Sequence, residues 1–172
     1  MNILLLVLGY LLLHLGQPFD IKVRDIQAHL FCDETGQFSA DVLGPEPSTL
    51  FGTPGGSGAP CAASSVLVVG EIFGADEDYM DYIRVSITAV IEANPAYETP
   101  ESEVERSRGI PISMEGGSAY LPLMLYQIGC SPIRVTVRVE SLNFGSVTAP
   151  KEPPEFVALD EREETIPFTC GH

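Results

Sequence analysis

The sequence IRVTVRVE, residues 133–140, decides the fold class of this chain. Its β-branched residues occupy every odd position and its polar residues every even position. Alternation with a period of two is typical of a strand that has one buried side and one side in water. β-branched residues strengthen this interpretation because they pack well on a pleated surface. We therefore predict a half-buried β-strand here.

A second stretch, IRVSITAVI at residues 83–91, repeats the pattern with Arg84, Ser86 and Thr88 at the outward positions. Two half-buried strands of this kind indicate an antiparallel sheet that is covered on one side. Residues 66–73 begin as a continuous apolar run, which indicates a central strand with both faces at least partly covered.

Residues 119–128 predict a further strand that contains Pro122. Because proline donates no backbone hydrogen bond, this strand should lie at a sheet edge or carry a bulge. Residues 21–31 predict the first strand, and their alternation changes phase beyond Val23. A β-bulge near Arg24 and Asp25 would accommodate the change. Weaker strand patterns occur in residues 104–114 and 165–169.

Three segments interrupt the strands. Residues 44–63 are rich in Pro and Gly and predict a long surface loop. Residues 94–108 predict a solvated connector with one helical turn. Residues 149–164 predict an extended segment that runs across the surface before the last strand. Six or seven short strands without an amphipathic helix predict an all-β fold, an antiparallel β-sandwich of immunoglobulin-like shape with long surface loops. A small β-barrel is the alternative.

Residues 3–15 are almost wholly apolar, too few to span a bilayer but typical of a signal peptide. We therefore expect residues 1–17 to be a signal peptide and residues 18–172 to form a single exported domain, periplasmic or secreted. The first two residues carry no Lys or Arg, so a buried first strand or an uncleaved anchor is the alternative.

The chain has four cysteines, and an even number in an exported chain predicts that they form disulfides, here two. We expect one disulfide between Cys32 and Cys61, which would close the Pro- and Gly-rich loop of residues 44–63. We expect the other between Cys130 and Cys170, which would join the ends of neighbouring strands. The two crossed pairings are the alternatives. No pair has the spacing of a zinc site or of a redox motif.

The net charge is −15, with 24 acidic residues against 9 Lys and Arg. Such a chain repels nucleic acid and an anionic membrane, so we expect neither as a partner after signal cleavage. The acidity also has the simpler interpretation that it keeps an exported protein soluble.

The sequence contains residues for three kinds of candidate site. Asp76, Asp78 and Asp81 form an acidic turn that could gather around Ca²⁺, although the turn lacks the EF-hand pattern and also resembles a solvated hairpin tip. A serine hydrolase would depend on His29, but no G-x-S-x-G motif accompanies it. A glycosidase needs a pair of carboxylates, and abundant acidic residues do not identify one.

The segment IQAHLF at residues 26–31, followed by TGQFS and DVL, resembles the opening of small exported bacterial proteins with no assigned function. The ending IPF at residues 166–168, followed by Cys170 and Gly171, is similar to theirs. The resemblance covers under a quarter of the chain and implies export and compactness, but no activity.

These observations favour an exported, non-enzymatic structural or partner-binding module whose partner is a protein or a glycan. We expect no catalytic residue and no cofactor. A calcium-dependent adhesion or carbohydrate-binding domain is the first alternative, and a hydrolase that uses His29 or a carboxylate pair is the second.

Overall fold

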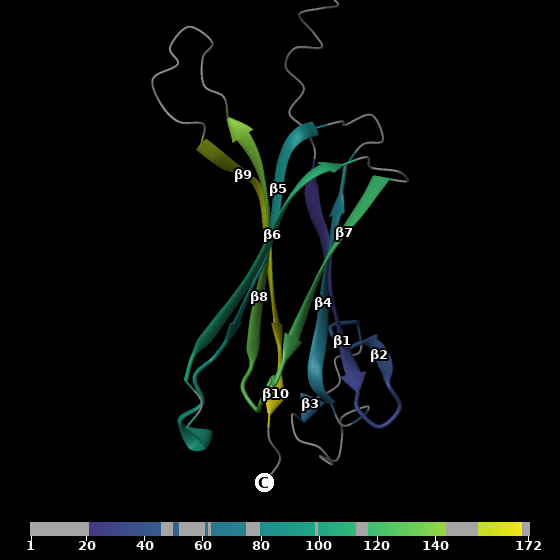
Figure 1. Cartoon of the computed structure of the whole chain (residues 1–172), viewed down its shortest axis with the longest axis vertical. Coiled ribbons are helices and arrows are strands. Elements are labelled where there is room, and N and C mark those ends of the chain that lie inside the picture. Colours follow the sequence, from purple (N-terminus) through teal and green to yellow (C-terminus); the bar gives the residue numbers. More distant parts are fainter. Residues whose placement is uncertain are drawn as a thin grey trace, which may run out of the picture.

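The computed structural model describes residues 21–45, 50–51, 61, 63–74, 80–98, 100–112, 117–143 and 155–169. Two four-stranded antiparallel sheets dominate it (Figure 1). The first has the strand order β2-β1-β4-β7, with bounds β1 Lys22–Cys32, β2 Gln37–Asp41, β4 Ala63–Phe73 and β7 Ser118–Tyr126. The second has the order β6-β5-β8-β9, with bounds β5 Met80–Ile91, β6 Ser102–Ile112, β8 Ile133–Asn143 and β9 Glu155–Ile166. The all-β prediction is confirmed, whereas the immunoglobulin-like detail stays a prediction.

The two sheets pack face to face, as in a β-sandwich. Inward residues of β4 and β7 and those of β5 and β8 belong to one hydrophobic core. At Gly70 the backbone of β4 lies close to side chains of the second sheet. A Cβ placed there would lie 3.0 Å from Val137 Cγ1 and 3.6 Å from Ile87 Cδ1. The inward residues of the two alternating stretches, 83–91 and 133–140, therefore fill the space between the sheets.

A third, two-stranded parallel sheet joins β3 (Leu50–Phe51) to β10 (Phe168–Thr169) at one end of the molecule (Figure 1). Phe168 is buried in the core. A single turn of 3₁₀ helix, η1 (Pro95–Tyr97), lies between β5 and β6. No described helix is long and apolar enough to cross a membrane.

Several local predictions are confirmed. The register of β1 against β4 shifts between Val23 and Asp25, which is the expected bulge. Among the described strands, β7 pairs only with β4, so Pro122 lies on an edge strand where its missing N–H costs no ladder bond. The helical turn expected in residues 94–108 is η1.

The loop predictions are partly wrong. Residues 102–108, expected in a connector, form most of β6 and are all exposed, whereas the weaker strand pattern of residues 104–114 is confirmed by β6 as far as Ile112. Most of residues 149–164, expected to cross the surface, pair with β8 as the edge strand β9. Within residues 44–63, the described part includes the short strand β3 and the start of β4. Edge strands bury little, so they lack the alternation that identifies inner strands.

Side chains of the second sheet form hydrogen bonds to backbone groups of the first sheet at the edges where the two sheets meet. On one side, Asp160 Oδ2 of β9 accepts a 2.8 Å hydrogen bond from the backbone N–H of Val23. Arg162 of β9 donates a 2.7 Å hydrogen bond to the carbonyl oxygen of Arg24. On the other side, Arg106 of β6 donates a 2.6 Å hydrogen bond to the carbonyl oxygen of Pro122. Polar contacts therefore occupy backbone groups that an open edge would offer to other chains.

Candidate functional site

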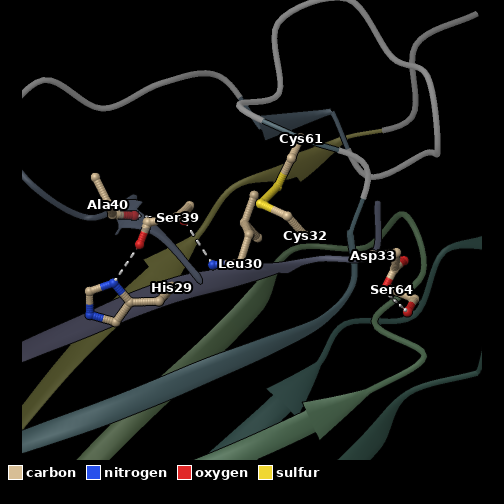
Figure 2. Close-up of a disulfide and its surroundings, with 8 residues drawn as sticks. All are labelled: His29, Leu30, Cys32, Asp33, Ser39, Ala40, Cys61 and Ser64. Atoms are coloured by element: carbon tan, nitrogen blue, oxygen red, sulfur yellow. Dashed lines mark hydrogen bonds between the residues drawn. A yellow bond between two sulfur atoms is a disulfide. The ribbon is translucent and has the colours of Figure 1, made fainter. Parts of the chain in front are cut away.

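The disulfide Cys32–Cys61 is present and joins the end of β1 to the chain just before β4 (Figure 2). Beside it, Asp33 accepts a 3.1 Å hydrogen bond from the Ser64 hydroxyl. Cys130 is also disulfide-bonded, and its expected partner, Cys170, lies outside the described residues. The expected pairing of the first two cysteines is thus confirmed.

His29 lies on the outer face of β1, opposite to the buried Ala28 and Leu30, as its phase predicts. Its Nδ1 lies 3.1 Å from the carbonyl oxygen of Ser39 (Figure 2). Because a carbonyl only accepts, Nδ1 must carry the proton in that contact. The Ser39 hydroxyl is engaged elsewhere, since it accepts from the Leu30 N–H and donates to the Ala40 carbonyl. In the described part of the chain, His29 therefore contacts a main-chain oxygen and not the Ser39 hydroxyl.

The calcium hypothesis is not tested by this structure. Asp76 and Asp78 lie outside the described residues, and Asp81 lies at the start of β5. No group of three or more His, Cys, Asp or Glu residues in the described ranges could hold a metal ion. The signal-peptide prediction for residues 1–17 likewise lies outside them.

The outer face of the first sheet carries exposed apolar and aromatic side chains, which we call the aromatic face. The strand register places its side chains in rows across β1, β4 and β7. Tyr120 and Tyr126 are 58% and 69% exposed, and Phe38 and Phe73 are 50% and 44% exposed. The members of the face are Phe31, Phe38, Leu67, Val69, Phe73, Tyr120, Pro122, Met124 and Tyr126.

At the β1–β2 end of this face, the rings of Phe31 and Phe38 meet edge to face, with 5.4 Å between their centroids. The adjoining turn contains the exposed carboxylates Asp33 and Glu34. The face is therefore apolar with an acidic rim at this end.

At the other end, Glu71 is a largely buried carboxylate on the outer side of β4. Its Oε1 accepts a hydrogen bond from the Ser118 hydroxyl at 2.9 Å and from the Tyr120 hydroxyl at 3.5 Å. Arg24 pairs with the same oxygen at 3.3 Å and lies over the Phe73 ring, 5.5 Å from its centroid. These contacts hold Tyr120 and Phe73 in place, which preorganises this end of the face.

The outer face of the second sheet is charged instead. Glu140 is buried, and its Oε2 accepts a 2.6 Å hydrogen bond from Arg84, whose guanidinium stacks 3.9 Å from the Phe156 ring centroid. Arg138 Nε lies 3.6 Å from Glu140 Oε1 and 3.5 Å from Glu161. These charges largely compensate one another, in contrast to the unpaired apolar groups of the aromatic face.

No protein-family model, no curated protein and no solved structure matches this chain. Its candidate sites therefore rest on the chemistry of the two outer faces. Sequence reasoning missed both faces because each is assembled from strands far apart in the chain. The one signal for the aromatic face was the outward phase of Tyr120 and Tyr126 in residues 119–128.

Proposed function

We propose that the chain is an exported, non-enzymatic module that binds a protein partner through the aromatic face. The observation that carries the proposal is the exposure of Phe38, Phe73, Tyr120 and Tyr126 on one sheet face. Exposed apolar patches rimmed by polar residues mark interaction sites, and Tyr and Phe are enriched in protein interfaces. Export is supported by the disulfides, because these persist in oxidising compartments.

The partner that fits is a protein with an apolar surface and basic side chains around it. Within the described part of the first sheet and its turns, the acids are Asp25, Asp33, Glu34, Asp41 and Glu71, and the basic residues are Lys22 and Arg24. The whole chain carries a net charge of −15. Charge complementarity therefore favours a basic partner, and repulsion disfavours a second copy of this chain.

A glycan fits this face less well. Across β4 and β7 its middle rows present Leu67, Val69, Pro122 and Met124, and Gln27 and His29 of β1 continue the same rows. Aliphatic side chains offer no hydrogen bonds to sugar hydroxyls, whereas they pack well against an apolar protein surface. We therefore assign the face to a protein.

Selection from a random-peptide phage library on the immobilised, disulfide-bonded chain tests the proposal. We expect enriched peptides that combine aromatic or aliphatic residues with Lys or Arg. Their synthetic forms should bind at least about tenfold more weakly to Tyr126→Ser and Phe38→Ser, since aromatic anchors dominate interfaces.

Arg134→Ser, an exposed change on the opposite face, is the matched control and should leave peptide binding unchanged. Two outcomes would overturn the proposal. Selected peptides might bind the two aromatic variants as well as the original chain, or a glycan array might show saccharide binding that the same aromatic variants abolish.

A further inference from the structure

The charged face contains a depression of about 300 Å³ that the aromatic face does not touch. Its lining comes from all four strands of the second sheet and is polar throughout: Glu105 from β6, Arg84, Ser86 and Thr88 from β5, Thr136, Arg138 and Glu140 from β8, and Glu161 from β9. A site of this size and polarity suits a small hydrophilic ligand rather than an apolar one.

Small hydroxyl side chains of the two central strands line the middle of the depression. Thr88 pairs with Thr136 across β5 and β8, and Ser86 pairs with Arg138. Ser86 is 9% exposed, and its side chain lines the depression. A hydroxyl that lines a depression can both donate a hydrogen bond to a polar ligand and accept one from it.

The charged groups around these hydroxyls are fixed before any ligand arrives. Arg84 is clamped between the Glu140 carboxylate and the Phe156 ring. Arg138 lies between Glu140 and Glu161 at distances longer than a good hydrogen bond, so its donors are oriented without being strongly engaged. Preorganised donors and acceptors reduce the entropy that binding must overcome.

The net charge of the lining narrows the ligand class. Three carboxylates and two guanidinium groups leave one negative charge, and the whole chain is strongly acidic. An anion would be repelled. Each sugar hydroxyl both donates and accepts, so adjacent hydroxyls can donate to a carboxylate and accept from a guanidinium or a threonine.

We propose that this depression binds one neutral saccharide unit, with the Ser86, Thr88 and Thr136 hydroxyls and the Arg138 guanidinium as its hydrogen-bonding groups. The site is independent of the aromatic face, because the two lie on opposite outer faces of the sandwich. It gives the module a second recognition surface of different chemistry.

The test is an NMR titration of the full, isotope-labelled chain with methyl glycosides of the common neutral hexoses, N-acetylhexosamines and fucose. We expect at least one glycoside to shift the backbone amides of Ser86, Thr88, Thr136 and Arg138 in a saturable way. Thr136→Val and Ser86→Ala keep the size of the side chains nearly unchanged, although the first also removes the exposed 3.4 Å hydrogen bond from Thr136 to Glu163. Each should weaken binding at least about fivefold with little change in the melting temperature.

Tyr126→Ser, on the aromatic face, is the matched control and should bind the glycoside as the original chain does. Acetate, propylamine and glycine serve as anionic, cationic and zwitterionic probes and should leave the four amides unshifted. The inference is overturned if no glycoside shifts these amides, if the hydroxyl variants bind equally well, or if one of the charged probes binds instead.

Discussion

At the residue scale, inward and outward positions of the same strand have opposite consequences. Val135 and Ile87 are fully buried between the sheets, whereas His29 lies half-buried on an outer face. Replacing Val135 or Ile87 with Asp would desolvate an unpaired carboxylate at a cost of several kcal/mol, comparable with the stability of the whole domain. We expect both variants to be unfolded by far-ultraviolet circular dichroism.

His29→Ala should fold normally and keep the binding properties of the chain, because it loses one contact to a main-chain oxygen. Loss of a hydrolytic activity in a folded His29→Ala variant would favour the hydrolase hypothesis over the binding module.

Ser131 offers a test of polar burial. It is fully buried, and its hydroxyl has no hydrogen-bond partner in the part of the chain that the structure describes. Ser131→Ala should raise the free energy of unfolding by about 1 kcal/mol, because it removes an unsatisfied group. Ser39→Ala is the contrasting variant: it removes the acceptor of the Leu30 N–H and should lower that free energy by about 1 kcal/mol. Urea denaturation measures both, and equal losses would contradict this account.

At the scale of strands, the spacing of the two sheets depends on Gly70. A methyl group there would meet Val137 Cγ1 at 3.0 Å and Cγ2 at 3.1 Å. Gly70→Ala should lower the free energy of unfolding by about 1–3 kcal/mol, the usual cost of overpacking a core. Gly109→Ala is the control, since a Cβ at Gly109 meets no atom within 4 Å. Urea unfolding of the two variants should therefore differ clearly, and equal midpoints would show that the sheets are not closely packed at Gly70.

The seam between β1 and β9 makes a second prediction at this scale. Asp160→Ala leaves the Val23 N–H without its acceptor and should cost about 1.5–3 kcal/mol, as expected for a hydrogen bond to a charged group. Hydrogen exchange should show faster exchange at Val23 than in the original chain. Unchanged exchange there would mean that the carboxylate does not close the seam.

Some strands and one bulge could be predicted from the sequence, whereas an edge strand and the candidate sites could not. Strict alternation predicted β5 and β8, and the phase change after Val23 predicted the bulge in β1. Most of β9 was not predicted, because its sequence, EFVALDEREETI, is charged and mostly exposed. Such a strand does not show the alternation of apolar and polar residues that burial of one face produces. The candidate sites were missed for another reason: the ion pair of Arg84 with Glu140 joins residues 56 positions apart. Only the strand register places such residues together.

At the scale of the whole molecule, the disulfide Cys32–Cys61 joins the end of β1 to the chain just before β4 across a sequence separation of 29. The double variant Cys32→Ala/Cys61→Ala should lose about 3–4 kcal/mol of stability in the chain-entropy model. Thermal unfolding measures the loss. A melting temperature equal to that of the original chain would show that the disulfide adds nothing to the stability of the folded sheet.

The two outer faces divide the molecule into an apolar side and a charged side, and the central claim is that the apolar side binds a protein. Site-specific photo-crosslinking in the native host tests this claim most directly, with a photoreactive phenylalanine placed singly at Tyr120, Tyr126 or Arg134. We expect one protein adduct of the same mass from positions 120 and 126, lost in the Phe38→Ser background, and no such adduct from position 134. Adducts from position 134 alone, or none from the two tyrosine positions, would contradict it.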